Sequence, residues 1–285
     1  MKVSLIPLYA FIIAVFFLVE GVHSQVRDNE RMRNFPTIIK EIDSFPKKED
    51  VWVFLLAGQS NMAGRGLVEA TDTIAHPKIF ALDINDNWIQ AKAPLHRYQP
   101  ALTGLGSGIF FARELIKNVD RDVSIALVPL AVGGTSIDYW LNDEQIQGIK
   151  LRSNFNRMLQ LAMEKGSLKG ILWHQGESDA FLDKIPEYQQ KLETLFQYFR
   201  LYSGEMELPI ITAELGAFAS TGETRFLWQM INKKIESIAF KDPNIILVRT
   251  DDLKARHDNV HFDGASQRLL GFRYARAYQH LALTQ

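Results

Sequence analysis

The sequence predicts an α/β protein, a three-layer α/β/α sandwich built around a five-stranded parallel sheet. Five short and almost wholly apolar segments alternate along the chain with five longer segments of helical periodicity. The apolar runs lack the polar alternation of half-exposed strands, which is typical of parallel strands covered by helices on both faces. Because 47% of the 285 residues are hydrophobic, the chain can bury one substantial core, and we expect a single domain over residues 50–285.

The predicted elements follow one another in a regular order. Strands are expected at residues 51–57, 123–130, 171–173, 209–213 and 245–249. Helices are expected at residues 108–118, 155–165, 186–202, 225–240 and 266–282. Five such strands favour a flavodoxin-like arrangement, in which ligands bind at the carboxyl edge of the sheet.

Residues 66–103 show little periodicity and carry several aromatic residues. Such a long irregular insertion is often a substrate-binding wall, but it can equally be a surface excursion that packs its own aromatics. The sequence leaves both alternatives open.

The first 24 residues have the pattern of a secretory signal peptide. Lys2 precedes an apolar run over residues 5–19, and the small residue Ser24 would precede cleavage before Gln25. An uncleaved membrane anchor is the alternative, but the run is shorter than the roughly 20 residues that a membrane span needs. We therefore expect a secreted or periplasmic protein without stable membrane insertion after cleavage, and a charged lead-in over residues 25–49 that is flexible or docked at the periphery.

Charge and composition exclude several function classes. The formal net charge of −1 provides no field for nucleic acid, and the absence of cysteine excludes disulfides and thiolate ligands. His257 and His261 have no third ligand at a suitable spacing, so we expect no metal and no cofactor. The oligomeric state is not predicted by the sequence.

Ser60 is the predicted nucleophile. It follows the apolar run of residues 51–57, where a buried strand should end and a helix begin, and where α/β hydrolytic enzymes present reactive groups. A serine in this setting is also an ordinary helix cap or turn residue. Met62 stands where a G-x-S-x-G motif would have its second glycine, so the nucleophile elbow is not indicated.

Asp258 and His261 are the predicted partners of Ser60. Their three-residue spacing allows the carboxylate to reach one imidazole nitrogen while the other faces a serine. His257 and Asp263 lie in the same segment and are the alternatives.

Two further polar segments follow predicted strands and could stabilise an oxyanion. Gly133, with Gly134 next to it, could provide a backbone amide, and Gln175 could donate a side-chain N–H. Ordinary strand-to-helix turns are the alternative for both segments. Trp140 and Trp173 lie close by and could either stack on a sugar ring or belong to the core.

Together, the four segments resemble, in order, the sequence blocks of the SGNH hydrolases. More narrowly they resemble the sialate O-acetylesterase and acetylxylan esterase branch, carbohydrate esterase family six, over about residues 50–282. The blocks are GQSNMAG at 58–64, AVGGTSI at 131–137, WHQGESD at 173–179 and DNVHF at 258–262.

This resemblance implies the SGNH-hydrolase fold and a Ser60–His261–Asp258 triad. It also implies an oxyanion hole formed by the Ser60 amide, the Gly133 amide and the Gln175 side chain, although Gln175 stands where many SGNH hydrolases carry asparagine. Further candidates for positioning or substrate contact are Gln59, Asn61, Gly134, Glu177, Trp140, His174 and Arg65.

The implied function is that of a serine esterase that removes O-acetyl groups from carbohydrate, such as acetylated xylan or O-acetylated sialic acid. Its partner would be the acetylated carbohydrate substrate. Two alternatives remain, a hydrolase of acyl-lipid or aryl esters with the same triad and a non-catalytic carbohydrate-binding protein.

Overall fold

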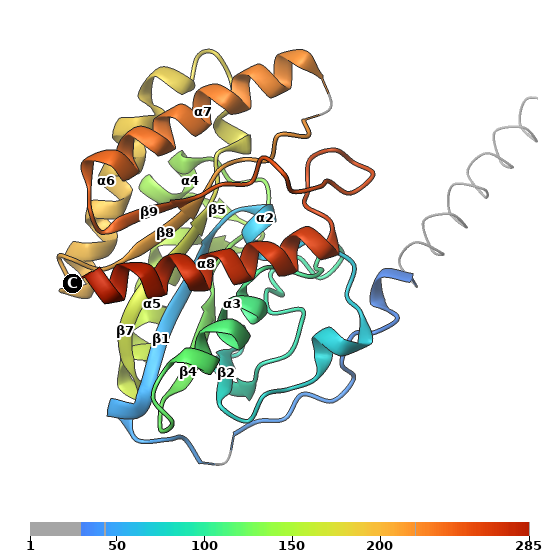
Figure 1. Ribbon diagram of the computed structural model, residues 1–285, viewed down its shortest axis with the longest axis vertical. Helices are drawn as coiled ribbons and strands as arrows, with labels where there is room; N and C mark the ends of the chain where they lie inside the picture. The colour runs from blue at the N-terminus through green and yellow to red at the C-terminus, as the bar shows by residue number, and fades with distance from the viewer. Residues whose placement is uncertain (1–29, 43, 220, 285) are drawn as a thin grey trace, which may run out of the picture.

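The computed structural model describes residues 30–42, 44–219 and 221–284 (Figure 1). The predicted signal peptide and its cleavage site lie outside these residues. Within the described ranges, no helix combines the length and the apolar composition that crossing a bilayer requires.

A seven-stranded sheet forms the centre of the molecule, in the order β3-β2-β4-β1-β7-β8-β9 (Figure 1). Neighbouring strands are parallel except for β3, which runs antiparallel to β2. The strands of this sheet are β1 (Val51–Gly58), β2 (Ile79–Leu82), β3 (Trp88–Gln90), β4 (Ser124–Pro129), β7 (Ser167–His174), β8 (Ile210–Ala213) and β9 (Ile245–Val248). A separate two-stranded ribbon contains β5 (Gln145–Ile146) and β6 (Ile149–Lys150).

The α/β prediction is confirmed, and the five predicted strands lie side by side in the order β4-β1-β7-β8-β9. With the strands numbered along the chain, this is the flavodoxin-like order 2-1-3-4-5. The predicted number of strands was wrong, because β2 and β3 extend the sheet beyond β4. Both come from the 66–103 insertion, and with four and three residues they are too short to show a period in the sequence.

Helices cover both faces of the sheet. They are α2 (Ser60–Ala63), α3 (Gly108–Leu115), α4 (Ile137–Leu141), α5 (Leu151–Lys165), α6 (Ile185–Ser203), α7 (Gly222–Lys241) and α8 (Gly264–Thr284). Short 3₁₀ turns occur at Lys48–Asp50, Ala70–Thr73, Ile116–Asn118 and Glu177–Asp179. On one face α8 packs beside α3, and on the other lie α4, α5, α6 and α7 (Figure 1).

Side chains of β1 alternate between two hydrophobic clusters. Val53 and Leu55 pack under α5 and α6, whereas Phe54 and Leu56 pack under α3 and α8, and all four are fully buried. The two faces therefore each contribute a core, as expected for a central parallel strand.

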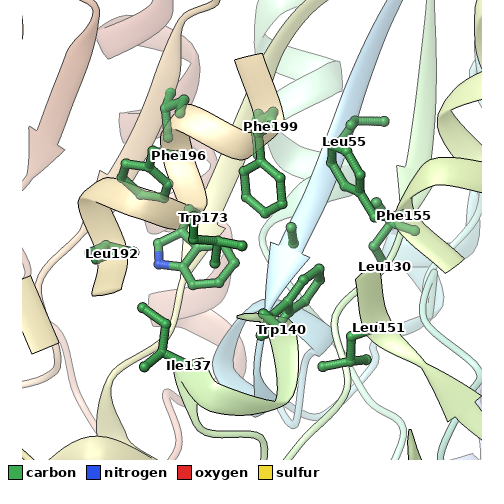
Figure 2. Packing of buried hydrophobic residues seen from close by; sticks show 14 of the residues in the cluster. Leu55, Leu130, Ile137, Trp140, Leu151, Phe155, Trp173, Leu192, Phe196 and Phe199 are labelled. Atoms are coloured by element: carbon green, nitrogen blue, oxygen red, sulfur yellow. The ribbon is translucent and has the colours of Figure 1, made fainter. Parts of the chain in front are cut away.

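Trp140 and Trp173 belong to the first of these clusters. Both are fully buried, and their rings meet edge to face at 5.4 Å between centroids (Figure 2). The hypothesis that either ring stacks on a sugar was therefore wrong, because neighbouring core side chains already cover them.

The later part of the described lead-in lies along the edge of the sheet. Glu41 forms an antiparallel bridge with Ile89 of β3, and the Phe45 ring packs 5.0 Å from both Phe80 and Trp88. Aromatic residues of the insertion thus contact the lead-in at this edge.

Candidate active site

Ser60 is the first residue of α2, directly beyond the carboxyl end of β1. The chain reaches it through Gly58, whose φ of +132° disfavours a side chain and whose added Cβ would lie 2.1 Å from the His174 carbonyl oxygen. Among the described residues, no acceptor pairs with the Ser60 backbone N–H. The turn therefore presents a hydroxyl and an unpaired amide at the edge of the sheet.

The loop before α8 brings an imidazole to this hydroxyl. The His261 Nε2 atom lies 2.9 Å from Ser60 Oγ, and His261 Nδ1 lies 3.0 Å from Asp258 Oδ2. The second Asp258 oxygen accepts the backbone N–H groups of Val260 and His261, each at 2.9 Å. The structure thus joins three side chains from opposite ends of the chain in one hydrogen-bonded series.

The Asp258 carboxylate is held in its ionised form. Burial would raise its pKa, but hydrogen bonds from the His261 ring and from the His261 and Val260 amides outweigh this effect and lower the pKa to about 2. Asp258 therefore carries a negative charge beside the ring over the whole neutral and mildly acidic range.

The alternative residues of this loop lie elsewhere. Asp263 accepts the Ser266 N–H at 2.7 Å in the first turn of α8, which is the role of a helix cap. His257 is exposed on the wall of the cavity, and the hydrogen bonds to Ser60 and Asp258 are made by His261.

A cavity of about 1370 Å³ opens at this edge of the sheet. The predicted site residues on its wall are Gln59, Ser60, Gly133, Gly134, Glu177, Asp258 and His261, together with Arg65. Asn61, His174, Gln175 and Trp140 do not line it.

Gly133 follows β4 and lies directly beside Ser60. A Cβ on Gly133 would lie 3.1 Å from Ser60 Cβ, 2.6 Å from Gln99 Oε1 and 2.2 Å from Arg65 Nη2, so only glycine fits without displacing them. The Gly133 N–H donates to Gln99 Oε1 at 2.9 Å. The predicted second oxyanion amide is therefore directed to an acceptor within the cavity.

Gln175 is placed differently from the prediction. It is fully buried, and its Nε2 donates to Asp179 Oδ2, to the Thr135 carbonyl at 3.2 Å and to Gln59 Oε1 at 3.3 Å. Two residues after Trp173, it continues the side of β7 that α6 covers, where the Tyr188 hydroxyl donates to Gln175 Oε1 at 3.2 Å. Its Nε2 therefore donates inside the fold and not into the cavity, and the role of Gln175 at an oxyanion stays a prediction.

Asn61 connects the turn that carries Ser60 to the loop that carries His261. Its Oδ1 accepts the Phe262 N–H at 3.0 Å, and its Nδ2 donates to the Val260 carbonyl at 3.1 Å. The same Nδ2 donates to Glu177 Oε1 at 2.6 Å. Asn61 therefore holds both sides of His261 against the turn that carries Ser60.

Gln59 connects the turn that carries Ser60 to the turn after β7. Its Oε1 accepts the Gln175 Nε2 and the backbone N–H groups of Gly176 and Ser178, at 3.3–3.4 Å. Gly134 is exposed at the cavity with a φ of +81°. The described residues contain no group of three or more His, Asp or Glu side chains arranged to hold a metal ion.

Gln99 is a site residue that the sequence did not indicate. It lies in the 66–103 insertion, where neither a motif nor a period marks it. The ends of the insertion line the cavity through Leu67, Gln99 and Leu102, while its middle forms β2 and β3. The insertion is thus a cavity wall and an extension of the sheet at once.

Comparison with known families gives a match over most of the chain. A family model described as carbohydrate esterase, sialic acid-specific acetylesterase, matches residues 50–280. A probable carbohydrate esterase of Arabidopsis thaliana is 31% identical over 249 residues, which are 79% of this chain and 89% of that protein.

Solved structures with this fold include that Arabidopsis protein, with a TM-score of 0.68 and 27% identity over 80% of this chain and 98% of that one. NanS has a TM-score of 0.65 and 16% identity, and covers 84% of this chain and 99% of its own. A carbohydrate acetylesterase from Xanthomonas citri has a TM-score of 0.61 and 20% identity, over 83% of this chain and 57% of that one. At these identities the last two show the fold alone.

Proposed function

Because the chain belongs to the carbohydrate esterase family of sialic acid-specific acetylesterases, with the SGNH-hydrolase fold, and is a carboxylic ester hydrolase, we propose that it removes O-acetyl groups from carbohydrate through Ser60, His261 and Asp258. The single observation that carries the proposal is the hydrogen-bonded series from Ser60 Oγ to His261 and on to Asp258, inside a cavity large enough for a substrate.

The reaction proceeds in two steps. His261 takes the proton of the Ser60 hydroxyl as the oxygen attacks the acetyl carbonyl carbon, and the carbonyl electron pair moves to the oxygen. The protonated ring then gives its proton to the sugar oxygen as that bond breaks, and a water molecule releases acetate by the same route. Asp258 keeps the ring oriented and stabilises its charged form.

Backbone amides stabilise the tetrahedral oxyanion. The Ser60 N–H is unpaired within the described chain, and the Gly133 N–H is directed into the cavity next to it. Amides held rigidly at the ends of β1 and β4 need no reorganisation when the charge develops, which is the condition for strong stabilisation.

The lining of the cavity suits a ligand rich in hydroxyl groups. Arg31, Arg256, His257 and Glu177 provide charged and hydrogen-bonding groups around the triad. Phe181 lies on the same wall with 53% of its surface exposed, so a sugar ring can stack on it. Apolar side chains, among them Leu67 and Leu102, also line the cavity, so the length of the acyl chain has to be tested with a series of esters.

Acetate release from a panel of esters tests this function. Purified protein is incubated with acetylated xylan, O-acetylated sialic acid, an aryl acetate and longer-chain esters, and acetate or acid is quantified. We expect release from at least one acetylated carbohydrate, and its loss in Ser60→Ala. The matched control is Ser178→Ala, which removes a hydroxyl from the same cavity but leaves the Ser60–His261 hydrogen bond in place.

The outcomes separate the alternatives. Cleavage of longer-chain or aryl esters alone would identify a hydrolase of another ester class. Binding of sugar without any release would identify a carbohydrate-binding protein, and full activity of Ser60→Ala would remove Ser60 from the mechanism.

We also propose that the protein is exported and loses its first 24 residues. The support is the order of Lys2, the apolar run over residues 5–19 and the small residue Ser24. N-terminal sequencing of the exported protein should begin near Gln25, and a product that begins at Met1 would indicate an anchor instead.

A further inference from the structure

We propose that Arg65 is a charged donor of the oxyanion hole and that the side-chain carbonyl of Gln99 occupies this hole until a substrate displaces it. The proposal rests on the proposed esterase function, and it replaces Gln175 as the side-chain donor. It gives a role to Arg65 and Gln99, which belong neither to the predicted triad nor to the predicted oxyanion amides.

The first support is the set of hydrogen bonds around Gln99. Its Oε1 accepts the Gly133 N–H at 2.9 Å and the Arg65 Nη2 at 2.6 Å, while its Nε2 donates to the Gly133 carbonyl at 3.1 Å. An amide oxygen carries partial negative charge, as the carbonyl oxygen of an ester does. The protein's own carbonyl group therefore already occupies the position that two converging donors create.

The second support is the distance of this position from the nucleophile. One point, the place of a Cβ on Gly133, lies 2.2 Å from Arg65 Nη2, 2.6 Å from Gln99 Oε1 and 3.1 Å from Ser60 Cβ. Because both distances start from one point, Arg65 Nη2 lies at most about 5.3 Å from Ser60 Cβ. A carbonyl group attacked by Ser60 Oγ would place its oxygen within the same small volume.

The third support is the charge of Arg65. Its side chain is 6% exposed, and within the described residues no carboxylate lies at ion-pair distance from it. Its hydrogen bonds go to neutral oxygens, Gly64 O at 2.9 Å and Gln99 Oε1. Asp258 attracts Arg65 only at longer range. Buried cations are normally paired, so a developing oxyanion would supply the negative partner in direct contact that Arg65 lacks among the described residues.

Burial, with a further effect from the nearby Arg256 and Arg31 guanidinium groups, lowers the pKa of Arg65 to about 10. The group therefore keeps its charge at neutral pH. Its positive charge would favour the transition state over the neutral ester, which is the requirement for catalysis by differential binding.

Other side-chain donors fit this role less well. Gln175 Nε2 already has three acceptors inside the fold. Gln59 lines the cavity, and its Nε2 has no acceptor among the described residues. The Gly133 N–H donates to Gln99 Oε1, an acceptor that Gln59 does not share. Among the side chains that the structure describes, only Arg65 shares an acceptor with that amide.

The attack of Ser60 on the ester needs no reactant besides the substrate. The substrate displaces Gln99, the Ser60 oxygen forms a bond to the carbonyl carbon, and His261 accepts the hydroxyl proton. The carbonyl π electrons move to the substrate oxygen, which then accepts hydrogen bonds from Gly133 N–H and Arg65. When the leaving oxygen departs, the electrons return and the carbonyl is restored.

Two substitutions of Gln99 should change the kinetics in opposite directions and so test whether it occupies the hole. In Gln99→Ala the hole is vacant, and we expect KM for a small acetate ester to fall about three- to tenfold, the worth of displaced hydrogen bonds. In Gln99→Glu a carboxylate would pair with Arg65 and stay in place, and kcat/KM should fall about tenfold or more. The control is Gln160→Glu, which adds the same charge to an exposed position of α5.

Substitutions of Arg65 test the donor itself. We expect Arg65→Met to lower kcat about a hundredfold or more with little change in KM, as for loss of one oxyanion donor. Arg65→Lys keeps the charge and should recover part of the rate. Thermal unfolding of both variants separates lost chemistry from lost fold.

The results distinguish failure of this inference from failure of the proposed function. If Ser60→Ala abolishes acetate release while folded Arg65→Met keeps the wild-type kcat, the inference is overturned and the esterase stands. If Gln99→Ala and Gln99→Glu shift the kinetics in the same direction, Gln99 is not an occupant of the hole. If Ser60→Ala is active, the proposed function itself has failed.

Discussion

The turn after β1 and the turn after β7 begin from similar sequence patterns and have different surroundings. Both follow neighbouring buried strands, and both carry a polar residue predicted to act on the substrate. Ser60 lies on the cavity wall, 2.9 Å from His261, whereas Gln175 is fully buried with its amide donated to three acceptors. A polar residue at the carboxyl end of a strand therefore marks the edge of the sheet, but not which way its side chain points.

The packing of the next helix explains the difference. After β1 the chain turns into the four-residue α2, which leaves Ser60 at the cavity. After β7 it continues along the side that α6 covers, and Gln175 joins Tyr188 and Asp179 beneath that helix. One turn exposes a hydroxyl group at the cavity, and the other turn is packed inside the fold.

Loss of the His261 imidazole should give the largest change in activity. His261→Gln should lower kcat at least about a thousandfold, because no base remains for Ser60. The measurement is acetate release at saturating substrate, with circular dichroism to verify the fold. His257→Gln, which alters an exposed histidine of the same cavity, should retain activity. The reverse pattern would assign the base to the other histidine.

Asn61→Ala should have the next largest effect, a decrease in kcat of about ten- to a hundredfold with a smaller change in KM. The substitution removes the hydrogen bonds to Phe262, Val260 and Glu177 that fix the His261 loop, and small misplacements of a catalytic group are costly. Glu177→Gln keeps an acceptor for Asn61 and should stay close to wild type. A full rate in Asn61→Ala would show that the loop holds itself.

Gln175→Met should affect stability instead of chemistry. It removes the side-chain amide that donates to the buried Asp179 carboxylate and Thr135 carbonyl, which should lower the free energy of unfolding by about 1–3 kcal/mol. The Tyr188 hydroxyl keeps the Gln175 backbone carbonyl as its acceptor, and Asp179 keeps the Ile137 N–H. Urea unfolding measures this change, and kcat of the folded enzyme should stay within a few-fold. A hundredfold loss of kcat at unchanged stability would instead make Gln175 an oxyanion donor and remove the contrast between the two turns.

The smallest expected effect is a dependence of stability on pH that comes from His174, at the end of β7. Burial lowers the pKa of His174, with Glu177 and the Glu214 carbonyl opposing it, so the unfolded chain binds a proton more readily than the folded one. Stability is therefore complete above the ordinary histidine value of 6.5 and decreases as pH falls below it, by at most about 1.4 kcal/mol per pH unit for one proton.

Urea unfolding between pH 7 and pH 5 measures this dependence. In His174→Gln, which does not titrate, the dependence should be shallower, and an unchanged slope would contradict the assignment. Asp258, with its pKa of about 2, stays charged over this whole range, so the carboxylate beside His261 should not contribute to the change.

Much of the fold could be predicted because buried parallel strands leave apolar runs in the sequence. Residues 51–57 and 245–249 were predicted within one residue of β1 and β9. The prediction for β7 included only residues 171–173, because its first half contains Lys169 and Gly170 and does not look apolar. The strands β2 and β3 were missed because pairing with a neighbour, and not local periodicity, makes them strands.

The sequence by itself determined the α/β class and the strand ends that carry polar residues. It also predicted the pairing of Asp258 with His261 from a three-residue spacing within one loop, with His257 and Asp263 as alternatives, and the structure shows that contact. Only the tertiary structure decided that Gln175 faces the interior, that Trp140 lies in the core, and that Gln99 meets Gly133 and Arg65 beside Ser60. The physical reason is that periodicity and spacing record how neighbouring residues along the chain are arranged. The direction of a side chain beyond a strand end depends on which distant segments pack against it.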